Sequence, residues 1–274
     1  MNIKLIIVLI FSTLFLSGCY NSQKSSPLVA AEDINTEKPA TATLEIDLEK
    51  LEATVPILIY HHIREIQSND SQDARTFIVI PENFEKQLKY LADNNFTTIY
   101  FDDLVNYFKG ISNLPEKPII ITFDDGTTNQ YNNAFPFLQK YNLVATFYLF
   151  TNPIDINDNY LNSVQIKEMS NEGMAFGSHG WYHLYLDKEK DDAVLNKEII
   201  SSKQKLEKIL NQEVTTFAYP FGSYLPETID RLKAAGYTTA RGIVNGQDHT
   251  SSDLFKLNGY FITNDFQRFK NIVN

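Results

Sequence analysis

Cysteine, tryptophan and positive charge are all scarce in this chain. Among its 274 residues there is one cysteine, so no disulfide can form within the chain and cysteine pairing gives no indication of its compartment. Lys and Arg number 24 against 34 Asp and Glu, a formal net charge of −10. Because affinity for nucleic acids comes largely from cationic contacts with phosphates, this balance argues against a nucleic-acid partner. The chain also has no internal repeat and no glycine-rich phosphate loop.

Apolar and aromatic residues, in contrast, are plentiful, at 43% and 13% of the chain. A chain of this length and composition can bury the core of one substantial domain, which we expect to be monomeric. The 15 Tyr and 19 Phe suit a sugar-binding surface, because pyranose rings present flat C–H faces to aromatic rings. Ordinary core packing is the alternative for any single ring.

The first residues have the pattern of an export signal. Lys4 precedes an apolar run over residues 5–16 that is too short to span a bilayer comfortably. The run ends in Leu16-Ser17-Gly18-Cys19, which resembles the lipobox of bacterial lipoproteins. That resemblance implies removal of residues 1–18, a diacylglycerol on Cys19, and an exported protein anchored to a bacterial membrane, facing the periplasm or the cell surface. An ordinary cleaved signal with a stray cysteine is the alternative.

Polar residues dominate from position 20 to about 54, and we interpret residues 19–54 as a flexible tether and residues 55–274 as the folded domain. Strand-like and helical patterns alternate in that domain. Strands are expected over residues 56–60, 97–100, 118–123, 144–150, 175–178, 216–219, 237–241 and 257–262. Helices are expected over residues 81–94, 102–109, 131–141, 164–172, 191–210 and 226–235. The alternation predicts an α/β fold with a parallel sheet, and seven to eight strands favour a closed or nearly closed (β/α) barrel.

Chemically useful residues follow several of the expected strands. Because active sites of such barrels collect at the carboxyl ends of the strands, we expect these residues to meet. They are His61 and His62, Asp124 and Asp125, His179, and Pro220 and Phe221.

One carboxylate and two imidazoles, Asp125, His179 and His183, have the composition of a metal site with an open position for water. A pair of His residues spaced by three is a weak signal alone, and a core or surface pair is the alternative. The adjacent carboxylates of Asp124 and Asp125 strengthen the case, because like charges at the end of an apolar strand repel each other unless a cation binds one of them. Asp124 would then be free to act as a general base.

Three segments resemble the first three motifs of the polysaccharide deacetylases, also called carbohydrate esterase family four or the NodB-homology domain. They are residues 122–126, Ser178-His179 with His183, and residues 217–222. The resemblance implies a distorted (β/α) barrel that often lacks one strand. It implies Asp124 as the catalytic base and Asp125, His179 and His183 as ligands of a divalent metal, usually zinc and sometimes cobalt, nickel or manganese. It also implies Phe221, whose N–H contributes to the oxyanion hole, and Tyr219 as contacts for the oxyanion and substrate.

The chain departs from that family at three places, one of which is the absence of an Asp-Trp motif, since the only tryptophan is Trp181. Ala218 stands where many members have an arginine that orients the base, so another group must hold Asp124. The C-terminal Leu-x-His, which supplies the general acid in much of the family, is absent, and Leu257-Asn258-Gly259 stands near its place. The segment Ile59-Tyr60-His61-His62-Ile63 resembles the opening strand of a subgroup that includes the exported poly-β-1,6-N-acetylglucosamine deacetylases of biofilms. That resemblance suggests His61 as the acid or a transition-state hydrogen-bond donor.

Two other histidines are expected to lie outside the site. His62 is expected to face away, since neighbours in a strand alternate sides, and His249 is expected to be solvated in a polar loop. The resulting expectation is a metal-dependent hydrolase that removes N-acetyl groups from an N-acetylglucosamine-containing polymer or oligomer. The alternatives are an O-acetyl esterase and a tethered, inactive carbohydrate-binding protein on the same fold.

Overall fold

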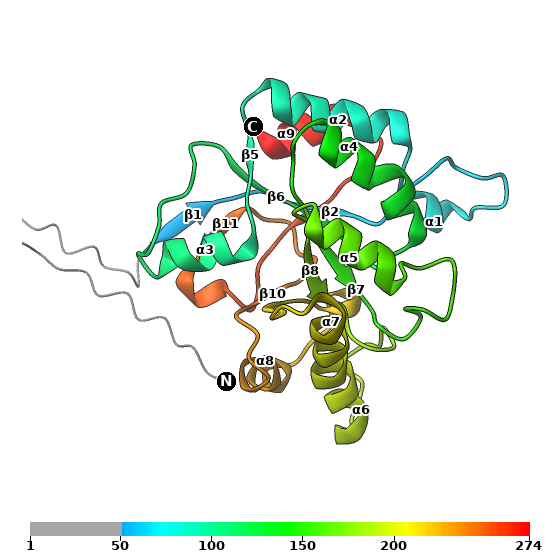
Figure 1. Cartoon of the computed structure of the whole chain (residues 1–274). Coiled ribbons are helices and arrows are strands. Elements are labelled where there is room, and N and C mark those ends of the chain that lie inside the picture. The colour runs from blue at the N-terminus through cyan, green and yellow to red at the C-terminus, as the bar shows by residue number, and fades with distance from the viewer. Residues whose placement is uncertain (1–50) are drawn as a thin grey trace, which may run out of the picture. The chain divides into compact units, whose positions relative to one another are not determined.

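The computed structural model describes residues 51–274, so the expected signal peptide, Cys19 and nearly all of the expected tether lie outside the described residues. Strands and helices alternate along this part of the chain (Figure 1). The strands are β1 Glu52–Thr54, β2 Ile57–Tyr60, β3 His62–Ile63, β4 Ile78–Val79, β5 Thr97–Thr98, β6 Pro118–Phe123, β7 Thr146–Leu149, β8 Ala175–Ser178, β9 Thr216–Ala218, β10 Thr239–Arg241, β11 Asp248–Thr250 and β12 Tyr260–Phe261. The helices are α1 Gln72–Arg75, α2 Pro81–Asp93, α3 Phe101–Phe108, α4 Phe135–Lys140, α5 Ser163–Asn171, α6 Asp192–Asn196, α7 Ser202–Leu210, α8 Pro226–Ala234 and α9 Phe266–Val273. Within residues 51–274, none of the helices has the length and apolarity needed to cross a bilayer.

The central sheet has the strand order β10-β9-β8-β7-β6-β2-β12, and β5 pairs with the beginning of β6. Every neighbouring pair in this seven-strand order is parallel. The edge strand β10 is linked to the segment before β12, because Leu257 N–H donates to Ala240 O (3.0 Å) and Gly242 N–H donates to Leu257 O (2.9 Å). The expected parallel α/β fold with a distorted barrel is therefore confirmed.

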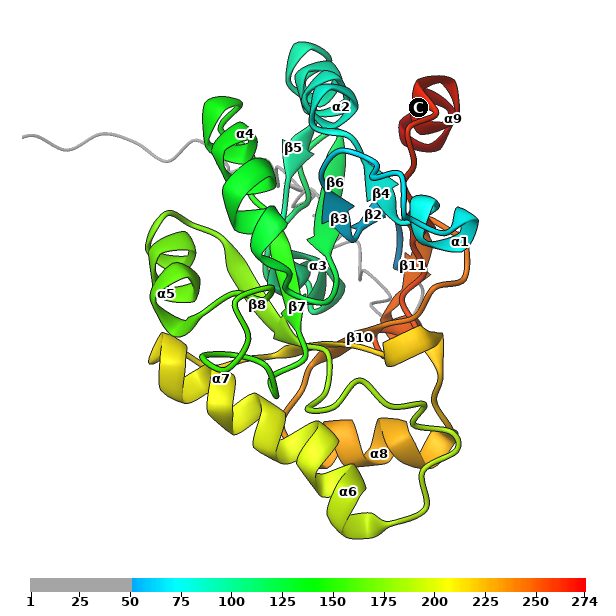
Figure 2. The same ribbon diagram turned by 90° about the vertical axis from the view of Figure 1, so that its right-hand side faces the viewer.

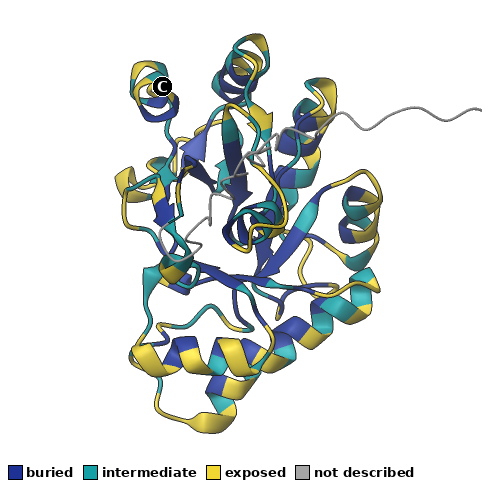
Figure 3. Ribbon diagram, turned by 90° about the vertical axis from the view of Figure 1, so that its left-hand side faces the viewer, coloured by how far each residue is buried: buried dark blue, intermediate teal, exposed yellow. Residues whose placement is uncertain are grey.

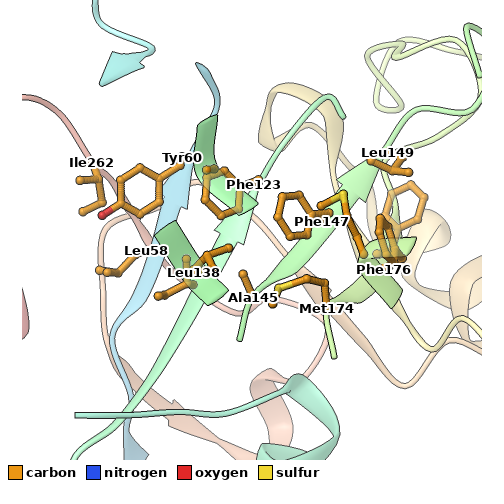
Figure 4. Packing of buried hydrophobic residues seen from close by; sticks show 14 of the residues in the cluster. Leu58, Tyr60, Phe123, Leu138, Ala145, Phe147, Leu149, Met174, Phe176 and Ile262 are labelled. Atoms are coloured by element: carbon orange, nitrogen blue, oxygen red, sulfur yellow. The ribbon is translucent and has the colours of Figure 1, made fainter. Parts of the chain in front are cut away.

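Alternating side chains of the strands form two apolar layers. In β6, Ile119, Ile121 and Phe123 pack in the larger cluster against the helices, whereas Ile120 belongs to a smaller inner cluster. Figure 2 shows α2, α4, α5 and α7 around the outer side of the strands. Figure 3 shows that the central strands are mostly buried, whereas these helices are buried on one face and exposed on the other. Tyr60, Phe123 and Phe147 lie side by side in this outer layer (Figure 4), with ring centroids 5.4 and 4.7 Å apart along the row.

Local signals explain where the helices begin. α2 begins at Pro81, whose missing N–H costs nothing at the first helical position, and it buries Phe84, Leu88 and Leu91 at the expected spacing. α5 is capped by Asn162, whose side chain accepts the N–H groups of Val164 and Gln165.

Some elements were not expected from the sequence. α1, β3 and β4 occupy residues 62–79, and α9 ends the chain. β1 precedes the expected domain boundary at residue 55 and pairs with β11. The expectation of a solvated His249 is wrong: its side chain is buried in β11 and its Nε2 lies 3.0 Å from Val55 O, so this histidine links β11 to the residue that follows β1.

Candidate active site

A cavity of about 580 Å³ lies at the carboxyl ends of the strands. Asp124 and Asp125 directly follow β6, His179 follows β8, and Phe221 lies three residues after β9. The fold therefore brings together the residues that the strand-end argument selected. The complete lining is His61, His62, Arg64, Ala74, Phe77, Asp124, Asp125, His179, His183, Tyr185, Tyr219, Phe221, Ile243 and Phe261.

Asp125, His179 and His183 place one ligand atom each within 4.8 Å of one another. The His179 and His183 Nε2 atoms are 3.2 Å apart, and Asp125 Oδ1 lies 3.8 Å from the former and 3.5 Å from the latter. Ligand atoms ~2.1 Å from a tetrahedral zinc ion would be ~3.4 Å apart. The spacing of the three donors therefore fits a tetrahedral divalent ion with one position left open.

The protonation of the three side chains also suits a cation. His179 Nδ1–H donates to Ala218 O (2.7 Å), which leaves the Nε2 lone pair free to bind a metal. Burial lowers the pKa of His179 to about 4 and that of His183 to about 3, so both rings are neutral at pH 7. Burial, followed by the negative charge of Asp124, raises the pKa of Asp125 to about 7. A divalent ion would supply the positive charge that the Asp125 carboxylate needs.

Asp124 is buried and forms an ion pair with Arg241, the last residue of β10. Arg241 is also buried, donates to Gly242 O (3.0 Å), and lies with its guanidinium carbon 5.1 Å from the centroid of the Tyr148 ring. Burial alone would raise the pKa of Asp124, but the Arg241 charge and the nearby His rings outweigh burial, and the pKa lies below its ordinary value. Asp124 is thus an ionised carboxylate in a fixed orientation, as a general base requires.

Arg241 takes the place of the orienting arginine that is missing at Ala218. Ala218 lies in β9, and Arg241 is its paired neighbour in β10, so the arginine reaches Asp124 from the adjacent strand. Sequence reasoning did not select Arg241. The signal that could have found it is the one that selected Asp124, a charged residue at the end of an expected strand. The absence of an arginine at position 218 therefore gives no reason to regard the protein as inactive.

His61 lies on the other side of Asp124, with its Nε2 3.9 Å from Asp124 Oδ2. Burial lowers the pKa of His61 to about 4, so the ring is neutral at pH 7. Gln130, a second residue not selected from the sequence, joins the two strand ends by donating to the carbonyl oxygens of His61 and Asp124. The expectation that His62 faces away is wrong, because β2 ends at Tyr60 and the alternation is interrupted before β3. Asn129 Nδ2–H donates to His62 Nδ1 (3.2 Å) at the cavity wall.

Asp125, His183 and Phe221 all have left-handed backbone conformations, with φ of 74°, 64° and 58°. Such angles are uncommon for residues other than glycine and gather at functional sites. Phe221 has this conformation within the short 3₁₀ turn Pro220–Gly222, at the wall of the cavity. Tyr219 borders the cavity, but its hydroxyl donates to Phe255 O (3.0 Å) within the protein. The proton of the Tyr219 hydroxyl is therefore used within the protein, and the role of Tyr219 as a contact for the oxyanion and substrate stays a prediction.

Two aromatic groups stand on either side of the polar centre. Phe77, from the unexpected segment before β4, is 40% exposed. Its ring centroid lies 4.9 Å from that of His61 and 5.8 Å from that of Phe261. Across the site, Phe221 stacks on Tyr185 at 3.9 Å with an interplanar angle of 5°, and both rings are 44% exposed. Flat rings that stay exposed around a polar centre suit a ligand with both apolar faces and polar edges.

Comparison with known proteins assigns the chain to a family. The polysaccharide deacetylase family matches residues 111–240. The Bacillus subtilis protein named "Putative polysaccharide deacetylase YxkH" is 30% identical over 241 residues, covering 84% of this chain and 82% of that protein. The chain belongs to the polysaccharide deacetylase family. The metal-ligand set and the ionised carboxylate described above are therefore the candidate active site of a deacetylase, a hydrolytic enzyme.

Two further proteins are similar to this chain over most of its length. The poly-β-1,6-N-acetyl-D-glucosamine N-deacetylase of Staphylococcus epidermidis is 26% identical over 230 residues, which cover 76% of this deacetylase and 78% of the relative. The solved structure of Streptococcus pyogenes deacetylase PplD in complex with acetate is 26% identical with a TM-score of 0.75, and the match covers 82% of this deacetylase and all of that chain. Both similarities extend across most of the described residues.

Proposed function

We propose that this deacetylase removes N-acetyl groups from an N-acetylglucosamine-containing polymer or oligomer at the bacterial cell envelope. The observation that carries the proposal is the ionised, arginine-held Asp124 beside three metal-ligand side chains in one cavity. A purely binding protein would not need a general base. The S. epidermidis relative is named for N-acetyl removal from such a polymer, which supports this substrate class.

Asp125, His179 and His183 would hold the divalent ion, and zinc suits two imidazoles and one carboxylate at this spacing. Cobalt, nickel or manganese are alternatives with the same ligands. When bound, the ion polarises the attacking water and the acetyl carbonyl. The remaining steps belong to side chains and backbone groups of the protein.

Asp124 accepts the proton of the attacking water, whose oxygen bonds to the acetyl carbon. The negative charge that develops on the carbonyl oxygen is stabilised by the N–H of Phe221, a residue with a left-handed backbone in the turn Pro220–Gly222 at the cavity. The carbon–nitrogen bond then breaks, and the proton that Asp124 accepted from the water passes to the sugar nitrogen, which leaves acetate and a free amine and returns Asp124 to its ionised form. His61 is neutral, and we assign to it a hydrogen bond to the departing nitrogen.

The aromatic walls support a sugar substrate. Phe77 on one side and the stacked Tyr185 and Phe221 on the other offer flat faces for the C–H faces of pyranose rings. The net charge of −10 also favours a product that becomes cationic as acetyl groups are removed.

Acetate release from defined glycans tests this function against ester hydrolysis. The zinc-loaded protein is incubated with β-1,6-linked N-acetylglucosamine oligomers, chitin oligomers and O-acetylated xylan at equal acetyl concentration. We expect faster release from an N-acetylated glucosamine oligomer than from the xylan. Release only from the xylan would replace amide hydrolysis by ester hydrolysis, and no release from any substrate would favour a binding protein.

For location, we propose export and lipidation at Cys19, on the basis of the lipobox-like Leu16-Ser17-Gly18-Cys19. Cells that express the full chain and are fed a radiolabelled fatty acid should label the wild type and not C19A. Cell fractionation should then find the wild type with the membrane and C19A outside it. Equal distribution of the two forms would contradict lipid anchoring.

A further inference from the structure

The loop after β8 carries His183 and is held from two sides. Gly180 and His183 both have left-handed backbones, with φ of 85° and 64°. The carbonyl oxygens of Gly180 and Trp181 accept the N–H groups of Thr151 (3.0 Å) and Asn152 (2.9 Å) from the chain that follows β7. The N–H groups of the same loop point to its other side, toward a carboxylate.

That carboxylate belongs to Glu198, which is completely buried. Its Oε2 accepts Trp181 N–H (2.9 Å) and its Oε1 accepts Tyr182 N–H (2.8 Å). Burial raises the pKa of Glu198, although these bonds and the nearby N–H groups of His183 and Leu184 act in the opposite direction. A Cβ atom on Gly180 would overlap the Glu198 carboxylate, so the loop needs glycine at this point in order to close around it.

The helix that carries Glu198 is distorted at this position. Between α6 and α7, residues Lys197–Ser201 form a π-helical turn, which inserts an extra residue and redirects the side chains around it. One turn later, Ser202 Oγ donates to Glu198 O and lies 2.8 Å from Ser178 Oγ at the end of β8. The helix is thus fixed to the strand that leads into the loop, and the distorted turn places Glu198 beneath it.

The two histidines of the metal-ligand set differ in how their rings are oriented. His179 is held directly through its Nδ1 by Ala218 O. Among the described residues, no hydrogen bond reaches the Nδ1 of His183. The His183 ring packs against Phe221 and Phe150, with ring centroids 4.4 and 5.4 Å apart, and its position otherwise depends on the backbone of its loop. Two N–H groups of that loop are held by Glu198.

We propose that Glu198 is a positioning residue for the metal site. It holds the loop so that the His183 side chain lies close enough to His179 and Asp125 for all three to bind one metal ion. The inference rests on the proposed function, because it assumes that these three residues bind the metal. An outer partner that orients a metal ligand typically contributes a factor of about 10–100 to metal affinity. A residue that only stabilises the fold would lower thermal stability without changing metal affinity.

Zinc affinity measured by competition with a chromogenic chelator tests the inference in the full chain. We expect E198Q to bind zinc about 10–100-fold more weakly than wild type, because one N–H of the loop would then face an amide NH₂. The d–d absorption of the cobalt-loaded protein should also change in E198Q, since it reports the arrangement of the ligands. E213Q is the matched control, because Glu213 is exposed and its substitution should alter neither measurement.

Wild-type zinc affinity together with a wild-type cobalt spectrum in folded E198Q would overturn the proposal. If E198Q does not fold, E198D is measured instead, because it keeps the charge but withdraws the carboxylate by one methylene; wild-type affinity in E198D would then overturn it. Two further measurements distinguish failure of the proposed function from failure of this inference. D125A would bind zinc as well as wild type if the metal site were wrong, and a zinc-binding wild type without acetate release would contradict only the reaction.

Discussion

Arg241 and Asp124 form a buried ion pair although 117 residues separate them in the chain. The arginine occupies one carboxylate oxygen, Oδ1, while Oδ2 faces His61. The pair keeps Asp124 ionised and fixes its direction, and both properties are needed by a base that must meet a water molecule in one position.

Replacing Arg241 should therefore lower turnover more than substrate binding. For R241Q we expect kcat for acetate release to fall about 100-fold, the size typical of losing a well-placed base, with a much smaller change in KM. The unpaired buried carboxylate should also cost about 3–5 kcal/mol in the free energy of unfolding. Steady-state kinetics and denaturant unfolding measure the two effects. R231Q is the control, because Arg231 pairs with Asp192 at the surface, and a turnover of R241Q equal to that of R231Q would contradict the role of Arg241.

Zinc affinity should depend on pH through Asp125. Because the pKa of Asp125 is raised to about 7, a proton must leave this carboxylate when zinc binds below pH 7. The Kd should therefore rise about tenfold per pH unit between pH 7 and pH 5 and stay nearly constant above pH 7. The two histidines add nothing in this range, since their pKa values are about 4 and about 3.

A matched variant checks the cause of this pH dependence. The charge of Asp124 contributes to the raised pKa of Asp125, so D124N should move the bend in the plot of log Kd against pH to lower pH. A wild-type Kd that is flat from pH 5 to pH 8 would show that Asp125 is already ionised throughout and would contradict the assignment.

His61 should matter most when the leaving group needs a proton. For H61A we expect kcat on an N-acetylglucosamine oligomer to fall about 100-fold, because the departing amine loses its hydrogen-bond donor. An activated aryl acetate, whose leaving group departs without a proton, should be hydrolysed at nearly the wild-type rate. Equal losses on both substrates would place His61 outside the leaving-group step.

Phe77 should contribute to substrate binding without taking part in the reaction. Loss of one ring stack of about 1 kcal/mol in F77A should raise KM for an oligomer about fivefold and leave kcat nearly unchanged. I111A is the control, because Ile111 is also an exposed apolar residue but does not line the cavity. A KM for F77A that matches that of I111A would remove Phe77 from the sugar-binding surface.

The site residues that could be predicted from the sequence are those marked by a local sequence pattern. The end of a strand is visible in the sequence because an apolar run stops there, and this signal is enough to select Asp124, Asp125 and His179. The pairing of Arg241 with Asp124 has no such local signal, because it depends on β10 lying beside β9, and sheet neighbours cannot be read from local periodicity.

The wrong expectations for two histidines have the same cause. His62 was expected to face away because a continuous strand was assumed, whereas the backbone leaves β2 after Tyr60 and starts β3 at His62. His249 was expected in solvent because its neighbours are polar, but pairing of β11 with β1 buries it. Both errors come from tertiary pairings between segments that are separate in the sequence. The roles of Asp124 as base and of the three ligands in binding zinc stay predictions.

Zinc content and acetate release of D124N, measured on the same sample, test the central claim most directly. Asp124 is not among the three ligand side chains, so D124N should bind one zinc per chain as wild type does. Its release of acetate from an N-acetylglucosamine oligomer should fall by about 100-fold or more, because the water loses its proton acceptor. A zinc-loaded D124N with wild-type acetate release would contradict the account.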